Sequence, residues 1–193
     1  MGCLMQHTDK RMAVILAAME LVAENGFHGS PMSGIAKRAG VAAGTIYHYF
    51  ESKDALIEAT YAHLEEQLLE SIRQGYCEEG TVQERFLHIG RALVNSLIAF
   101  PMKFRFIEQF HNSPYGVANR RERMLGKKDD LVTSLFEDAR QQSLIKELPL
   151  PVVFALTFGP LLVISRDHIF ELIKLDGPLI EKTIKACWDA LKR

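Results

Sequence analysis

The spacing of apolar residues restricts the fold of this chain more than any other feature of its sequence. Along almost the whole chain these residues recur at steps of three and four, as in Met12, Ile15 and Met19 and again in Phe86 and Ile89. That spacing places side chains on one face of an α-helix, whereas a half-buried strand alternates apolar and polar residues. The sequence contains no alternating stretch, internal repeat or low-complexity tract. We therefore predict an all-α fold.

Glycine, proline and small polar residues divide this pattern into separate helices. Asn25-Gly26 ends the first helix, and Ser30-Pro31 opens the second, with the serine hydroxyl as its cap and the proline as its first residue. Gly40 ends that helix, because glycine adopts a positive φ at little cost. Ser52 is expected to cap a fourth helix, and residues 112–116 are expected to form a turn. The remaining helices are predicted at residues 42–50, 81–100, 101–112, 117–143, 150–175 and 178–192.

Composition and charge narrow the class of protein. Of 193 residues, 48% are hydrophobic and 24% charged, as in globular proteins that bury a core. The formal net charge of −1 gives no overall basicity that would by itself indicate a nucleic-acid partner. Cys3, Cys77 and Cys187 are far apart, which favours a reducing compartment without disulfides or zinc. The longest apolar stretch, 150–164, is short for a membrane span. We expect a cytoplasmic protein with no membrane partner.

Two short predicted helices joined at Gly40 have the proportions of a helix-turn-helix motif, at about residues 31–50. In this motif the first helix braces the second, and the second enters the major groove of DNA. Four apolar residues are expected to fix the angle between the two helices: Ile35, Ala36, Val41 and Ile46. Phe50 is also expected in the core.

The second of these helices has a composition suited to contact with DNA. It begins with three small residues, which let its backbone approach a duplex closely: Ala42, Ala43 and Gly44. It continues with three residues whose hydroxyl groups can donate to phosphate oxygens: Thr45, Tyr47 and Tyr49. Lys53, at the start of the next helix, can add a charge-assisted phosphate contact beside the positive end of that helix's dipole.

The stretch "IAKRAGVAAGTIYHYFESKDAL" (35–56) resembles the DNA-binding signature of the TetR/AcrR family of bacterial transcriptional regulators. "ILAAMELVAENGF" (15–27) is similar to the first helix of that family. The resemblance implies a three-helix DNA-binding domain at residues 8–53. It also implies a larger helical domain at residues 54–193 that dimerises and binds an effector. In such proteins the effector moves the fourth helix and spreads the two DNA-binding heads.

The resemblance also assigns roles to individual residues. Thr45, Tyr47 and Tyr49 match positions that contact phosphates and bases, and Lys53 matches a phosphate-binding lysine. Residues 42–44 fall where family members vary to set sequence preference. Ser33 lies where other members make a contact from the bracing helix. The chain departs from the family pattern at Pro31-Met32 and at Ala43, where a lysine is frequent.

The larger domain carries a short aromatic helix and two long apolar helices. Four residues of the aromatic helix are predicted to line an effector site, unless they are only packed core: Arg105, Phe106, Phe110 and His111. Residues 154–164 and 178–192 are predicted to form the homodimer interface, because the first of these helices is too apolar to face solvent. The alternative is that 154–164 is the central helix of the monomer.

These observations predict a ligand-responsive DNA-binding regulator, most consistent with a repressor that a small, largely apolar effector releases from its operator. Its expected partners are double-stranded operator DNA with an inverted repeat, an unidentified small-molecule effector and a second copy of the chain. Two alternatives are a DNA-binding architectural protein of the same fold without an effector and a helical protein–protein adaptor. No enzymatic motif is present, and we expect no catalytic residue, cofactor or metal; Glu108 and His111 are three residues apart, as in an ordinary helix face.

Overall fold

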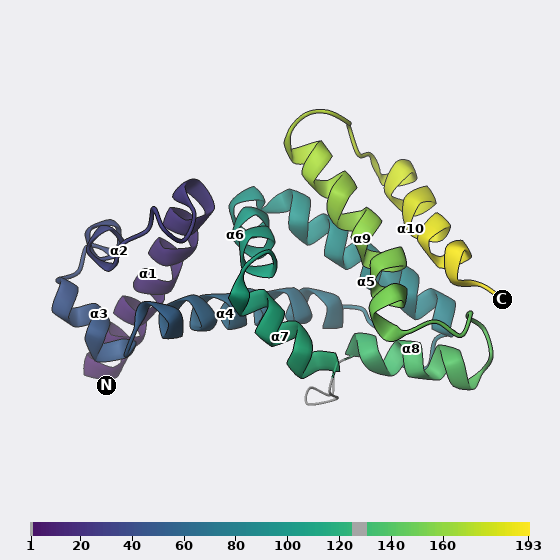
Figure 1. Cartoon of the computed structure of the whole chain (residues 1–193), viewed down its shortest axis with the longest axis horizontal. Helices are drawn as coiled ribbons and strands as arrows, with labels where there is room; N and C mark the ends of the chain where they lie inside the picture. The colour runs from purple at the N-terminus through teal and green to yellow at the C-terminus, as the bar shows by residue number, and fades with distance from the viewer. Residues whose placement is uncertain (1, 125–130) are drawn as a thin grey trace. The chain divides into compact units, whose positions relative to one another are not determined.

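A computed structural model describes the backbone of residues 2–124 and 131–193 and the side chains of residues 10–119 and 131–193. The described residues form ten helices and no strand, which confirms the all-α prediction (Figure 1). The helices are α1 (Gly2–Asn25), α2 (Met32–Ala39), α3 (Ala43–Tyr49), α4 (Lys53–Arg73), α5 (Val82–Ala99), α6 (Pro101–His111), α7 (Pro114–Met124), α8 (Leu131–Gln141), α9 (Leu150–Ile169) and α10 (Gly177–Leu191).

Most predicted helix ends are confirmed, and four need correction. The helix predicted at 150–175 is shorter, because α9 ends at Ile169. Ser30 does not cap α2; its hydroxyl donates to the carbonyl of Gly26 at 2.7 Å, and Pro31 precedes the helix. The predicted turn at 112–116 is shorter, because α7 already begins at Pro114. The single helix predicted at 117–143 is represented by α7 and α8, and its central part, 125–130, lies outside the described residues.

The described packing divides the chain into two compact units. Unit 1 comprises Met1–Gln67 and Met102–Val117, and unit 2 comprises Leu68–Pro101 and Ala118–Arg193. Unit 1 therefore includes α6, although α5 separates α6 from the first four helices in the sequence. The predicted division at residues 53 and 54 concerns function, and it stays a prediction.

Unit 1 has two apolar clusters that position its helices. One packs α1 against α2, α3 and the start of α4, and it includes Ile15, Ile35, Ile46 and Leu56, none more than 1% exposed. The other packs α1 and α4 against α6 through aromatic rings. In it, Tyr61 stacks on Phe110, with ring centroids 3.8 Å apart.

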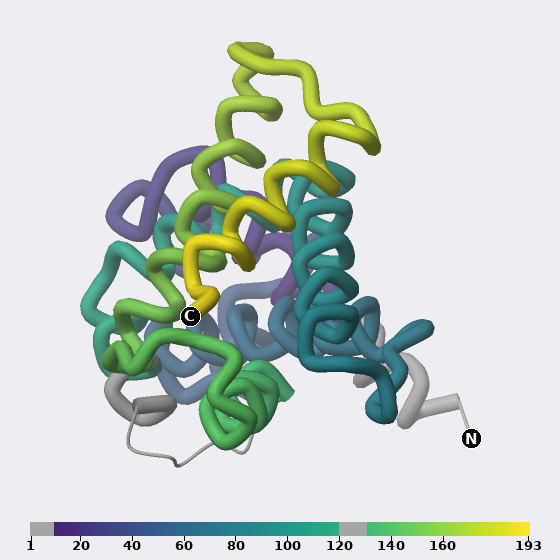
Figure 2. The backbone as a smooth tube through the Cα atoms, turned by 90° about the vertical axis from the view of Figure 1, so that its right-hand side faces the viewer, coloured from purple at the N-terminus to yellow at the C-terminus, as the bar shows by residue number. Residues whose placement is uncertain are grey.

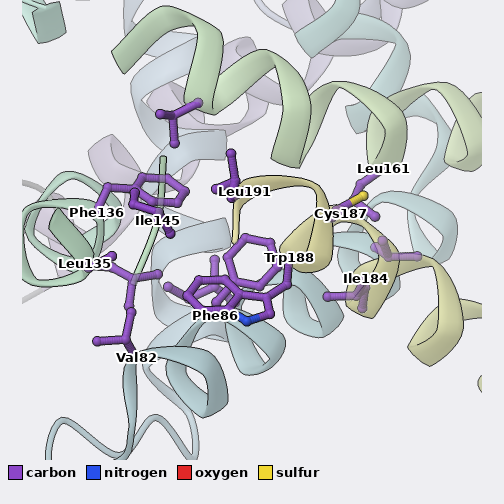
Figure 3. Packing of buried hydrophobic residues seen from close by; sticks show 14 of the residues in the cluster. Val82, Phe86, Leu135, Phe136, Ile145, Leu161, Ile184, Cys187, Trp188 and Leu191 are labelled. Atoms are coloured by element: carbon purple, nitrogen blue, oxygen red, sulfur yellow. The ribbon is translucent and has the colours of Figure 1, made fainter. Parts of the chain in front are cut away.

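Unit 2 is built around α5, α9 and α10, which contact one another, with α8 packed against α5. In both views α9 and α10 run side by side (Figures 1 and 2). Figure 3 shows the ring of Phe86 beside the indole of Trp188, at a centroid separation of 5.2 Å. Gly90 permits the close approach of α10 to α5, because a Cβ there would lie 2.7 Å from Ile184. These contacts bury the largest of the three hydrophobic clusters in the described part of the chain.

The apolar helix α9 extends beyond the stretch 150–164 considered in the sequence. Its 20 residues are long and apolar enough to cross a membrane by length and composition alone. However, Val153, Thr157 and Leu161 are buried in unit 2, and the hydroxyl of Thr157 donates to the carbonyl of Val153 at 2.8 Å. Only 22% of its 18-residue apolar window is buried, so α9 contributes one face to the core of unit 2.

Candidate nucleic-acid interface

The helix pair α2–α3 is held in place by the residues predicted for its core. Ile35, Ala36 and Ile46 are buried, and Val41 is half-buried against the same cluster. Phe50 is also buried, as predicted, and the guanidinium of Arg11 lies 5.2 Å from the centroid of its ring. A cation over an aromatic face is attractive, so α1 contributes to holding the end of α3.

Gly40 makes the turn between the two helices in the left-handed conformation predicted for it, with φ of +67°. A Cβ at this position would meet nothing within 4 Å, so backbone conformation, and not space, is the reason for a glycine. The Val41 N–H donates to the carbonyl of Ala36 at 3.0 Å and closes the turn. The direction of α3 relative to α2 is thereby fixed.

The start of α3 is small and open. Ala42, Ala43 and Gly44 are exposed, and a Cβ added at Gly44 would meet nothing within 4 Å. Because Gly44 has an ordinary helical φ and free space around it, nothing within the described part of the chain requires a glycine there. Glycine inside a helix costs about 1 kcal/mol relative to alanine. The glycine therefore leaves open space at the surface of α3.

The hydroxyl-bearing residues differ in how far they extend into solvent. Tyr47 is 57% exposed and is one of the most exposed large hydrophobic residues among those described. Thr45 and Tyr49 are half-buried, and the ring of Tyr49 lies edge-on to that of His48. Ser33 is exposed on α2. The structure thus brings Tyr47 and the small residues together on an exposed part of the motif.

Lys53 is the first residue of α4, and Ser52 caps this helix as predicted, accepting from the Ala55 N–H at 3.1 Å. The ammonium group of Lys53 is half-buried and donates to the carbonyl oxygen of Phe27 in the α1–α2 turn. An ammonium has three donors, so this bond leaves two for a phosphate oxygen. The bond also ties the start of α4 to the turn that precedes the helix-turn-helix motif.

An ion pair that the sequence analysis missed braces α2. Both terminal nitrogens of the Arg38 guanidinium donate to the Glu24 carboxylate at 2.7 Å, and Glu20 lies 3.7 Å away. These hydrogen bonds hold the pKa of the Glu24 carboxyl below its ordinary value. Helical spacing places Glu20 and Glu24 on one face of α1, but it does not indicate which helix that face contacts. Arg38 is therefore engaged within the motif.

The four residues predicted to line an effector site all lie in unit 1. Phe106 and Phe110 are buried in the aromatic cluster between α1, α4 and α6. His111 is half-buried with its ring 5.5 Å from that of Tyr61, and Arg105 is exposed. The structure therefore joins three of them to one cluster and leaves Arg105 at the surface. Their contact with an effector stays a prediction.

These features define a helical protein with an N-terminal helix-turn-helix motif whose second helix presents a small, exposed N-terminus. Comparison with known families identifies the group. Residues 14–60 match the model described as bacterial regulatory proteins, tetR family. Residues 81–192 match the model described as tetracyclin repressor-like, C-terminal domain. The chain belongs to the TetR family of transcriptional regulators, which are not enzymes.

Individual relatives agree with this assignment. A fatty acid metabolism regulator protein of Bacillus subtilis is 41% identical over 80 residues, which span 42% of this chain and 41% of that protein. An uncharacterised HTH-type transcriptional regulator of Haemophilus influenzae is 24% identical over 96% of this chain and 97% of its own length. The fold matches a TetR-family regulator of Marinobacter aquaeolei, with a TM-score of 0.86, 24% identity and coverage of 98% and 99% of the two chains.

A fatty acid degradation regulator, FadR, of Bacillus halodurans also has this fold, with a TM-score of 0.75 and 22% identity over 94% of this chain and 99% of its own.

Proposed function

We propose that this regulator is a repressor that binds an inverted-repeat operator as a homodimer and leaves it when a small, largely apolar effector binds. Its main support is the start of α3, where exposed small residues and an unconstrained glycine stand beside an exposed tyrosine. A helix that begins with such a surface can enter the major groove of DNA without steric obstruction. The protein would act in the cytoplasm.

The proposed DNA contacts are divided by chemistry. The main chain and methyl groups of residues 42–44 face base edges, and apolar contact with thymine methyl groups suits Ala42 and Ala43. The hydroxyl groups of Thr45, Tyr47, Tyr49 and Ser33 and the ammonium group of Lys53 contact phosphates. Because most of these contacts need no net charge, a homodimer whose chains each have a formal charge of −1 can bind DNA through its two DNA-binding domains.

The proposed dimer interface is an apolar stripe on α9. Val152, Leu156 and Val163 are exposed by 40%, 38% and 45%, and Gly159 between them has open space where a Cβ would be. The four residues follow one another at steps of four, three and four, so they lie along one side of the helix. A stripe of this kind buries itself against a second copy of the same helix, together with α10. Two-fold symmetry then requires two DNA half-sites in inverted orientation.

The proposed effector is an amphiphile with an apolar chain and a hydrogen-bond acceptor. Two relatives are named as regulators of fatty acid metabolism or degradation, which makes fatty acids and their esters the first compounds to test. Arg105, Phe106, Phe110 and His111 stand as predicted contacts, although an effector would have to displace the packed rings of Phe106 and Phe110.

We propose a second candidate contact for the effector in unit 2. The indole N–H of Trp188 is buried and has no acceptor among the described residues. An unpaired buried donor costs about 1–3 kcal/mol, which an acceptor on a ligand would recover.

The proposal is tested by first selecting an operator from a random library of duplexes. The selected operator, labelled for fluorescence anisotropy, is then titrated with the protein at several salt concentrations and with fatty acids of increasing chain length. We expect tight, salt-dependent binding and release by one range of chain lengths. The emission of Trp188, the single tryptophan, gives an independent readout of ligand binding. Salt-dependent binding that no compound weakens would favour the architectural protein, and the absence of duplex binding would favour the adaptor.

A further inference from the structure

The start of α4 is held by a second polar contact, from a segment that follows α5 in the sequence. Tyr115, in the first turn of α7, donates its hydroxyl to the Asp54 carboxylate at 2.5 Å. Asp54 follows Lys53 directly in the first turn of α4. Both partners belong to unit 1, and the two residues are 61 positions apart in the sequence.

The ring of Tyr115 is itself fixed by aromatic contacts. Its centroid lies 5.5 Å from that of Phe27, and Phe27 lies edge-on to Phe106 of α6 at 6.4 Å. Phe27 is also the residue whose carbonyl oxygen accepts from Lys53. The side chain of Tyr115 and the ammonium group of Lys53 therefore meet the same residue of the α1–α2 turn, one through its ring and the other through its carbonyl group.

The Tyr115 hydroxyl stays protonated, so it can keep its hydrogen bond to the Asp54 carboxylate. The bond to Asp54, the burial of the ring and the nearby charges of Asp54 and Glu58 raise the pKa of the Tyr115 hydroxyl to about 12. The hydroxyl therefore remains a donor throughout the range in which DNA binding is measured. A hydrogen bond to a carboxylate is stronger than one between neutral groups, although exposure to solvent reduces its net value.

We propose that Tyr115 is a positioning residue for operator binding, which holds Asp54 and thereby keeps Lys53 and the α1–α2 turn in the geometry that the DNA-binding motif requires. Tyr115 itself does not touch DNA. Its helix, α7, contributes residues to both units, as does α4.

The test is a set of double-mutant cycles on operator affinity, measured with the full chain by fluorescence anisotropy. Tyr115→Phe removes only the hydroxyl, and we expect about fivefold weaker operator binding with an unchanged dimer and only a slightly lower melting temperature. Asp54→Asn should weaken operator binding similarly, and the double variant should bind no more weakly than the single variant with the lower affinity. Tyr76→Phe, which removes a half-buried tyrosine hydroxyl in unit 2, is the matched control and should bind as the wild type does.

A second cycle distinguishes positioning from general loss of stability. In a Lys53→Ala background, Tyr115→Phe should lower the operator affinity little further. As a single substitution, Tyr115→Phe should reduce the slope of log affinity against log salt concentration by up to about one unit. Additive effects in either cycle, or a Tyr115→Phe affinity within about twofold of wild type, would overturn the role of Tyr115. This inference rests on the proposed function, so a wild-type protein that binds no duplex would overturn both the proposed function and the role of Tyr115. A wild-type protein that binds its operator, together with a Tyr115→Phe variant of unchanged affinity, would overturn only the role of Tyr115.

Discussion

Replacement of Gly44 by alanine should change stability and DNA binding in opposite directions. The position is helical, exposed and surrounded by open space, so the added methyl group clashes with nothing in unit 1. Alanine is favoured over glycine by about 1 kcal/mol in a helix interior, and we expect about half of that at the second position of this seven-residue helix. A gain of this size raises the melting temperature by about 1–2 °C in a chain of this length.

The same methyl group should obstruct the duplex. If the backbone of α3 approaches base edges at residue 44, a methyl group forced into a packed interface costs about 1–3 kcal/mol, or roughly 5- to 140-fold in operator affinity. Thermal unfolding and anisotropy with the selected operator measure the two effects on one preparation. Gly177→Ala is the control for the change in stability, because it also adds a methyl group in open space at the start of a helix, α10 of unit 2. A Gly44→Ala protein that binds its operator as tightly as the wild type would refute the close approach of DNA to this helix.

Four further predictions concern single contacts. Lys53→Ala should reduce the salt dependence of operator binding by about one unit of slope, and an unchanged slope would remove Lys53 from the phosphate contacts. Arg38→Ala should lower both operator affinity and the stability of unit 1 slightly, whereas Arg38→Ala in a Glu24→Gln background should cost less, as measured by thermal unfolding. Leu156→Glu should give monomers by light scattering without operator binding, because a charge then sits in the proposed α9 stripe; a dimer that still binds would contradict that interface. The pKa of Tyr115 is raised to about 12 in the folded chain, so its contribution to the free energy of unfolding is complete below its pKa in the unfolded chain, which is near 10. That contribution is lost as the pH rises from 10 towards 12, and the loss of stability over this range should be smaller in Tyr115→Phe.

Local features of the sequence predicted the helix-turn-helix motif well. Gly40, with its left-handed φ, and the buried residues Ile35 and Ile46 follow from backbone preferences and from apolar spacing within about fifteen residues. The cap at Ser52 was predictable for the same reason. Ser30 was assigned to the wrong helix, because a serine hydroxyl can accept from the N–H groups of the helix that follows it or donate to a carbonyl of the helix that precedes it.

Contacts between distant segments were beyond such signals. The Arg38–Glu24 pair depends on the angle at which α2 crosses α1, and the Tyr115–Asp54 bond depends on the return of α6 and α7 to unit 1. Helical spacing showed that Phe106 and Phe110 share a face, but not which helices that face contacts. Pro114 suited either a turn or the first position of a helix, and the neighbouring packing selects the helix.

The most direct test of the proposed recognition mode is selection of bound duplexes from a random library, carried out in parallel with the wild type and with Ala43→Arg. Ala43 is exposed at the start of α3, and an arginine there can donate two hydrogen bonds to guanine in the major groove. We predict that the wild type selects an inverted repeat and that Ala43→Arg selects guanine at one pair of symmetry-related positions. Selection of no repeat, or of the same sequence by both proteins, would contradict recognition of the operator by the start of α3.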